Sequence, residues 1–173
     1  MTTAPVIETE RLRLRAHRPA DFDACAALWA EPAVVRFLGG KPNTREECWN
    51  RMLRHAGFWA FTGMGSWLTE TKDDTFVGEI GFLWLKRDIE PRIEGVPEIG
   101  WILHPSVHGK GYATEAVRAA LAWGDAHLGH ARVTCLIAPE NTASLGVAAK
   151  TGFREFARSL YHGDPVVMLE RHR

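Results

Sequence analysis

The stretch His104–Ala116, HPSVHGKGYATEA, decides how the chain is interpreted. An apolar run, IGWIL at 99–103, precedes it, and a helical pattern from Thr114 to about His127 follows it. Glycine lets backbone amides approach a ligand closely, and the first turn of a helix has N–H groups without helical partners. A glycine loop between a strand and a helix N-terminus is therefore predicted to bind phosphate.

Two common nucleotide-binding motifs do not fit this loop. A P-loop requires glycine five residues before the Gly109–Lys110 pair and serine or threonine after it, but the chain has His104 and Gly111 there. A dinucleotide fingerprint aligned on the same glycines requires glycine or alanine at position 114, where the chain has threonine. Taken alone, the loop is also compatible with a strand-to-helix turn that binds no ligand.

Length and composition favour an ordinary globular protein. The 173 residues fit one domain, 1–173, and 46% of them are hydrophobic and 24% charged. Twenty-one basic residues balance 21 acidic ones, so no net field favours nucleic acid or an anionic membrane. The chain has neither a signal-peptide pattern nor an apolar run long enough to span a bilayer, which predicts a cytoplasmic protein.

The cysteine, histidine and arginine patterns do not indicate a disulfide framework, a metal site or a charged binding face. The cysteines are odd in number and far apart, which predicts buried, reduced thiols at Cys25, Cys48 and Cys135. No cysteine or carboxylate completes a ligand set with the histidine pairs, so we expect no metal at His104/His108 or His127/His130. The alternating Arg11, Arg13 and Arg15 are interpreted as one solvated face of a strand.

Periodicity, capping and turn signals predict a mixed α/β fold with helices on both faces of one sheet. The expected elements are a strand at 11–16, a helix at 19–30, a short helix or turn at 32–37, a helix at 44–61, strands at 66–71 and 76–85, a loop at 86–97, a strand at 98–103, a helix at 114–127, a strand at 132–138, a helix at 142–151, and a hairpin at 153–161 and 166–171.

Later motifs give the loop a specific interpretation. The chain contains, in this order, Glu8-Thr-Glu-Arg-Leu-Arg-Leu-Arg15, Glu98-Ile-Gly-Trp-Ile-Leu103, Gly109-Lys-Gly-Tyr-Ala-Thr-Glu-Ala116, Asn141-x-x-Ser144 and Lys150-x-Gly-Phe153. With these motifs the chain resembles the GNAT-type N-acetyltransferase superfamily, in particular its ribosomal-protein-alanine acetyltransferase-like (RimJ/RimL-like) branch. The similarity covers nearly the whole chain apart from 86–97.

The resemblance implies a mixed, mostly antiparallel sheet with two splayed central parallel strands, and acetyl-CoA as co-substrate. The strand before the loop would hold the pantetheine arm and polarise the thioester through the backbone of Trp101, Ile102 and Leu103. The pyrophosphate loop would fall on His108, Gly109, Lys110, Gly111, Tyr112, Ala113 and Thr114. His108 stands where the family usually has glutamine or arginine, and Lys110 is interpreted as a solvated or phosphate-facing charge.

Direct aminolysis of a thioester needs a base for the ammonium, a donor for the oxyanion and an acid for the thiolate. Glu98 is the first candidate for the base, through water if needed, and Glu79 is its rival. The tyrosine that many relatives use as thiolate acid is absent from 145–149, so Ser144 is the nearest hydroxyl. Ser144 could equally be a helix cap. Asn141 is expected to bind the pantetheine arm or to serve as a plain turn residue.

The sequence does not identify the amine acceptor. The acceptor side would be built from the first two helices, the 86–97 loop and the last hairpin, with pocket or core positions for Trp29, Trp49, Trp59, Phe37 and Trp84. A protein N-terminus, a small amine or an antibiotic amine would fit, in a monomer or a homodimer. A non-catalytic acyl-CoA-binding sensor on the same fold is the main alternative, and an NAD-dependent enzyme is a third interpretation.

Overall fold

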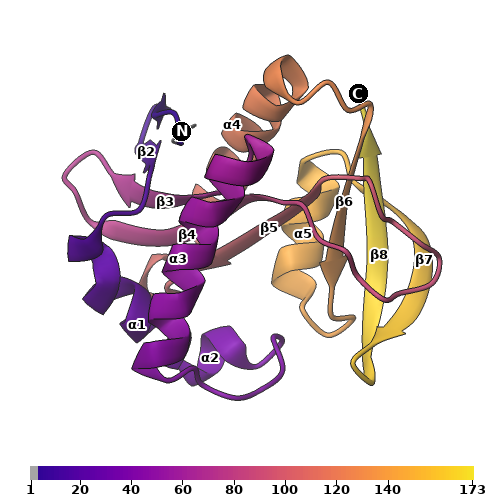
Figure 1. Ribbon diagram of the computed structural model, residues 1–173, viewed down its shortest axis with the longest axis horizontal. Coiled ribbons are helices and arrows are strands. Elements are labelled where there is room, and N and C mark those ends of the chain that lie inside the picture. The colour runs from indigo at the N-terminus through magenta and orange to yellow at the C-terminus, as the bar shows by residue number, and fades with distance from the viewer. Residues whose placement is uncertain (1–3) are drawn as a thin grey trace.

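The computed structural model describes residues 4–173, so the first three residues of the predicted domain 1–173 lie outside the described range. One eight-stranded sheet runs through the molecule in the order β1-β2-β3-β4-β5-β6-β8-β7 (Figure 1). Only β5 and β6 pair in parallel; all other neighbours are antiparallel. The strands are β1 Ile7–Glu8, β2 Leu12–Arg15, β3 Ser66–Thr71, β4 Phe76–Leu83, β5 Glu98–Leu103, β6 Arg132–Ile137, β7 Arg154–Tyr161 and β8 Asp164–His172.

Helices cover both faces of this sheet, which confirms the expected α/β class. Figure 1 shows α3 crossing one face of β3–β5, while α4 lies behind the same strands. The helices are η1 Pro19–Asp21, α1 Phe22–Ala30, α2 Pro32–Val35, α3 Arg45–Thr62, η2 Pro105–Val107, α4 Tyr112–His127 and α5 Thr142–Lys150. Within residues 4–173, no helix combines the length and the apolar composition that crossing a membrane requires.

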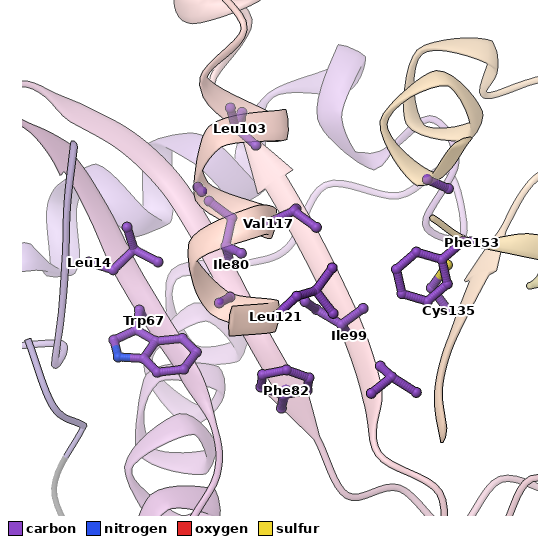
Figure 2. Packing of buried hydrophobic residues seen from close by; sticks show 14 of the residues in the cluster. Leu14, Trp67, Ile80, Phe82, Ile99, Leu103, Val117, Leu121, Cys135 and Phe153 are labelled. Carbon is purple, nitrogen blue, oxygen red and sulfur yellow. The ribbon is translucent and has the colours of Figure 1, made fainter. Parts of the chain in front are cut away.

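The main core lies between α4 and the sheet. Val117 and Leu121 of α4 belong to the same buried cluster as Ile80, Phe82 and Ile99 of the central strands (Figure 2). Gly124 is needed for this close approach, because a Cβ atom there would lie only 2.6 Å from the ring of Phe82. Burial of this apolar surface is what fixes α4, and with it the loop that precedes the helix.

Three indoles from three elements meet at one end of the core. Trp59 of α3, Trp67 of β3 and Trp123 of α4 have ring centroids 4.8, 5.2 and 5.4 Å apart, in edge-to-face arrangements. The Trp59 indole N–H also donates to the carbonyl oxygen of Ser66 at 3.0 Å. Trp59 is therefore a core residue and does not line the acceptor pocket.

Local signals place α3 accurately. Its N-cap Thr44 accepts a hydrogen bond from the backbone N–H of Glu47, whose side chain accepts one from the backbone N–H of Thr44. The helix ends at Gly63, which adopts the left-handed conformation that glycine favours at this position. The predicted capping box and glycine stop are both confirmed.

Two expectations about local structure are wrong, and one short strand has no signal in the sequence. Strand β1 at Ile7–Glu8 pairs with β2, although the sequence pattern does not indicate a strand there. Arg15 is not on a solvated face, because its guanidinium is buried between Asp21 at 2.9 Å and Glu70 at 2.7 Å. Helix α4 begins at Tyr112 instead of Thr114, because Gly111 in a left-handed conformation serves as its N-cap.

The 86–97 segment has neither helix nor strand, as expected. Its buried side chains Ile89 and Ile93 pack against Met168 of β8. Arg87, near its start, reaches back to Glu98 at the start of β5. This loop therefore connects the final hairpin to the central strands.

Candidate active site

The central parallel pair separates almost as soon as it forms. β5 and β6 are matched only at Glu98 and Thr134, and the N–H of Thr134 donates to Pro97 at 2.9 Å. From Ile99 to Leu103, β5 has ladder partners on the β4 side alone among the described strands. Main-chain groups at this edge of β5 are therefore available to a ligand, as the resemblance predicts for Trp101, Ile102 and Leu103.

A cavity of about 190 Å³ opens at this separation and extends to α3. Glu98, Gly100 and Ile102 lie on the same face as their cross-strand partners Leu83, Gly81 and Glu79, because paired residues point to one side of a sheet. Glu98, Gly100 and Ile102 therefore share one face of β5. The other walls come from Phe37, Leu38, Arg51, His55, Arg87, Cys135, Leu136, Ile137, Ala138, Asn141 and Ser144.

The glycine loop lies beyond the C-terminal end of β5. Gly109 and Gly111 both have positive φ, +75° and +79°, which favours glycine at each position. The first-turn N–H groups of Tyr112, Ala113 and Thr114 have no helical partners in such a position. The loop and helix start together have the geometry of an anion-binding site.

The N-terminal strand region holds this loop in place. Arg11 donates to the carbonyl oxygen of Lys110 at 2.9 Å and pairs with Glu115 at 2.6 Å. Thr9 donates to the same carboxylate at 2.7 Å. Burial opposes ionisation of Glu115, but the hydrogen bonds from Thr9 and Arg11 prevail and lower its pKa. The guanidinium of Arg11 also lies 4.9 Å from the ring centre of Tyr112, so this ring packs beside the loop.

His108 and Lys110 have different surroundings. His108 Nε2 lies 3.0 Å from the carbonyl oxygen of Leu103, which ties the loop to the end of β5. The Lys110 side chain is exposed, so its position fits the expected solvated or phosphate-facing charge.

The helix-cap role considered for Ser144 belongs to Asn141. The Asn141 side-chain oxygen accepts from the N–H of Ser144 at 3.1 Å, so Asn141 is the N-cap of α5. The alternative interpretation of Ser144 as a helix cap is therefore wrong. Its hydroxyl makes no hydrogen bond with residues 4–173, and the residue lines the cavity.

The two candidate bases face the same cavity with different partners. Glu98 is buried, and its two oxygens accept from Arg87 Nε and Nη2, each at 2.6 Å. The guanidinium of Arg87 stacks over Tyr161 of the last hairpin, 4.5 Å from the ring centre. This bidentate contact holds Glu98 in one orientation.

Glu79 is also buried, and both of its oxygens have partners. One oxygen lies 2.8 Å from His17 Nε2, and the other accepts from the Trp29 indole N–H at 2.7 Å. Burial alone would raise the pKa of Glu79, but the His17 hydrogen bond, the fields of His55 and His17 and the Trp29 N–H lower it to about 2. Glu79 is therefore an ionised, fully engaged carboxylate.

The same cluster brings together three groups that can bind metals. Ligand atoms of His17, Cys25 and Glu79 lie within 4.8 Å of one another. Burial raises the pKa of the Cys25 thiol, and the nearby Glu79 carboxylate adds to that rise. The protonated thiol and the engaged carboxylate make this a hydrogen-bonded cluster. All three cysteines are free and buried, as predicted.

Helix α3 contributes two polar residues that the sequence did not single out. Arg51 and His55 lie one helical turn apart, and both line the cavity. The His55 ring stacks on His17 at 5.0 Å, and its Nε2 is 3.7 Å from Glu79. Burial lowers the pKa of His55 to about 3, so the ring is neutral near pH 7.

Arg11, Arg51, His55 and Arg87 were missed for a common reason. Each reaches the site through contacts with residues far away in the chain, such as Arg11 with Glu115. An alternating or helical pattern marks the element but gives no pairing between elements. Of the aromatic candidates, Phe37 lines the cavity, Trp29 lies behind it, and Trp49 is partly exposed beside Phe22.

Comparisons with known proteins agree with this geometry. A family profile described as "Acetyltransferase (GNAT) domain" matches residues 11–154. The uncharacterized N-acetyltransferase p20 of Bacillus licheniformis is 27% identical over 149 residues, which cover 85% of this chain and 81% of the relative.

Solved structures share this fold over nearly the whole chain. A putative GnaT-family acetyltransferase from Bordetella pertussis has a TM-score of 0.85 and 30% identity, covering 97% of this chain and 99% of its own. RimL, a ribosomal L7/L12 alpha-N-protein acetyltransferase solved in complex with coenzyme A, has a TM-score of 0.78 at 21% identity, covering 97% and 98%. This second likeness concerns the fold alone. The chain therefore belongs to the GNAT acetyltransferase family, and it is an acetyl-CoA-dependent N-acetyltransferase.

Proposed function

We propose that the protein transfers the acetyl group of acetyl-CoA to a primary amine by direct aminolysis, with a protein N-terminus or a small molecule as the acceptor. The observation that carries this proposal is the cavity at the separation of β5 and β6. It is lined on one side by the strand edge and α5, and on the other by α3, so donor and acceptor can meet in one space.

The donor half is assigned to main-chain groups. The amides from Gly109 to Thr114 would hold the pyrophosphate, with Gly111 giving the closest backbone approach. The freed main chain of Trp101, Ile102 and Leu103 would hold the pantetheine arm and polarise the thioester carbonyl. The amide nitrogen of Asn141, whose oxygen caps α5, can donate to the same arm.

The chemistry begins with removal of a proton from the acceptor ammonium. The free amine then attacks the acetyl carbonyl carbon to give a tetrahedral intermediate with a positively charged nitrogen. The carbon–sulfur bond breaks, the nitrogen loses one proton to become the amide, and the CoA thiolate gains one proton. We assign Glu98 as the base because it stands where β5 and β6 separate, and it would act through a water molecule because each of its oxygens already accepts a hydrogen bond from Arg87. Glu79 is less suited to this role, because its partners lower its pKa to about 2 and so weaken it as a base.

Ser144 is assigned as the acid that protonates the leaving thiolate. Its hydroxyl is not used by residues 4–173, and it lines the cavity beside Asn141. A hydroxyl near the departing sulfur can give its proton to the thiolate and regain one, directly or through water, from the nitrogen of the tetrahedral intermediate.

Release of free CoA thiol from acetyl-CoA with a panel of amines tests the proposal. Turnover with at least one primary amine is expected, and Ser144→Ala should lower kcat about tenfold while the Kd of CoA stays unchanged. Thermal unfolding should be unaffected, because Asn141 is the helix cap. Tight CoA binding without turnover by any amine would instead favour the acyl-CoA sensor.

A further inference from the structure

The α3 wall of the cavity carries polar groups that the proposed acetyl transfer leaves unexplained. Arg51 and His55 point from one face of the helix into the space shared with Glu98 and Ser144. An acceptor whose amine reaches the thioester at the β5–β6 separation would extend toward these two side chains. Both side chains have hydrogen-bond donors without partners, and these donors indicate which chemical group of the acceptor they would bind.

Both carboxylates of the cavity already have partners. Glu98 accepts two hydrogen bonds from Arg87, and Glu79 accepts one on each oxygen, from His17 and Trp29. A second ammonium group on the acceptor would have to compete with these partners for a carboxylate, so an acceptor with a single amine fits the cavity better than a polyamine does.

Arg51 shows the opposite situation. It forms no ion pair and no hydrogen bond with residues 4–173, and its Nε is buried without a partner. Its guanidinium stacks on Trp29, 3.5 Å from the ring centre, which leaves the donors in the guanidinium plane free. Burial lowers the pKa of Arg51 to about 10, so the side chain remains charged at neutral pH. Arg51 is partly buried, and Glu79 contributes an opposite charge nearby without forming an ion pair with it. The free donors of the guanidinium can therefore receive an anion.

His55 adds a second unused donor. Only 3% of its surface is exposed, and neither ring nitrogen has a hydrogen-bond partner within the described part of the chain. Buried polar groups without partners are uncommon in native proteins, and they often mark ligand sites. The neutral ring can donate one N–H to an acceptor atom placed beside Arg51.

We propose that Arg51 and His55 form a carboxylate subsite and that the acceptor is a small amino acid, whose carboxylate lies a few bonds from the amine that is acetylated. This inference rests on the proposed function and specifies its substrate class. Arginine binds a carboxylate through two parallel hydrogen bonds, and the Trp29 stack fixes the plane of the fork.

Matched acceptors test the subsite directly. Thiol release is measured with α- and short ω-amino acids, with their amides, and with the corresponding decarboxylated amines. The free acids should have kcat/KM values about 10- to 100-fold above those of their amides, since the amide lacks the anion. Arg51→Met should bring that ratio close to one through a rise in KM, and Arg51→Lys should leave an intermediate ratio.

Arg54→Met is the matched control, because Arg54 is an exposed arginine on the same helix. It should leave the ratio of acid to amide as in the unmodified protein. Circular dichroism and the Kd of CoA, measured without acceptor, establish that each variant is folded.

Calorimetry with an N-acetyl amino acid and the protein–CoA complex tests the subsite independently of turnover. Arg51-dependent binding without turnover of any amine would contradict the proposed function but support the subsite. Equal rates with acids and amides, a ratio that survives Arg51→Met, or a preference for polyamines or peptide N-termini would overturn it. Absence of both turnover and N-acetyl amino acid binding would overturn it as well.

Discussion

The donor loop and the acceptor cavity adjoin each other, yet they are built by different means. The loop at 108–114 presents main-chain amides from one continuous stretch, and two glycines with positive φ give it its shape. The cavity presents side chains from α3, β4, β5 and the 86–97 loop, which are brought together only by the fold. A backbone site of this kind depends on local conformation, whereas a side-chain site depends on long-range pairing.

This difference separates what the two regions recognise. Under the proposed assignment, backbone amides would bind the phosphate groups that every acetyl-CoA molecule carries, so the loop would be general in its ligand. The cavity contains paired carboxylates beside an unpaired guanidinium, and we propose that this imbalance selects among acceptors. Changes in the loop should therefore affect CoA binding, and changes in the cavity should affect turnover, selectivity and pH response.

The largest expected effect comes from filling the loop. Gly111→Trp places an indole at the start of α4, where an added Cβ atom would lie 3.4 Å from the Arg11 guanidinium. The backbone would also have to keep a positive φ, which tryptophan disfavours. The Kd of CoA measured by calorimetry should rise about 100-fold or more.

Gly129→Trp provides the control for this prediction. Gly129 has a similar positive φ of +66° but open space around it, and it follows the other end of α4. Its strain of about 1–3 kcal/mol should lower stability and leave CoA affinity unchanged. Equal loss of CoA binding in the two variants would contradict the assignment of the loop.

A smaller but still large effect is expected in the cavity from Glu98→Gln. Loss of the base should lower kcat about 100-fold in the thiol-release assay, with the Kd of CoA unchanged. The change also leaves Arg87 partly buried without its partner, which should lower the free energy of unfolding by about 3 kcal/mol in urea.

The double variant Glu98→Gln/Arg87→Met separates these two consequences. It should recover much of the lost stability, because no unpaired charge remains, but not the lost turnover. Recovery of kcat along with stability would show that Glu98 acts only as a partner of Arg87.

The smallest effect concerns the pH dependence of stability, which should arise mainly on the cavity side. His55 has its pKa lowered from 6.5 to about 3 and Glu79 from 4.5 to about 2, so the unfolded chain binds more protons than the folded one at acidic pH. Their contribution is complete above pH 6.5 and is lost as the pH falls, His55 first.

His55→Phe should therefore make Tm less sensitive to acid. Between pH 6.5 and 4.5 its loss of Tm should be smaller than that of the unmodified protein by about 2–4 °C per pH unit. Above pH 7 the two curves should be parallel. Identical slopes in the acidic range would indicate that His55 is not buried in its neutral form.

The sequence was most informative where structure is local. The Thr44 capping box, the Gly63 stop and the glycine loop each depend on a few consecutive residues, and all three are present in the structure. The shared face of Glu98, Gly100 and Ile102 follows from strand alternation. The family resemblance supplied the separation of β5 and β6, which no local pattern encodes.

The side-chain partners could not be obtained in this way. Arg15 looked like a surface residue because its alternation with leucine is the same whether its face meets water or Asp21 and Glu70. Ser144 looked like a cap because serine and asparagine both favour that position, and Asn141 occupies it. The Arg87–Glu98 pair closes an irregular loop, for which periodicity offers no register.

The indole triad of Trp59, Trp67 and Trp123 has an optical consequence. Three chromophores with centroids about 5 Å apart and rings steeply inclined to one another couple their electronic transitions, which produces a split circular dichroism band that isolated tryptophans lack. Because α3, β3 and α4 contribute one ring each, the band reports the docking of these elements and not their helicity. Its loss during unfolding would therefore mark the moment at which the two faces of the sheet lose their covering helices.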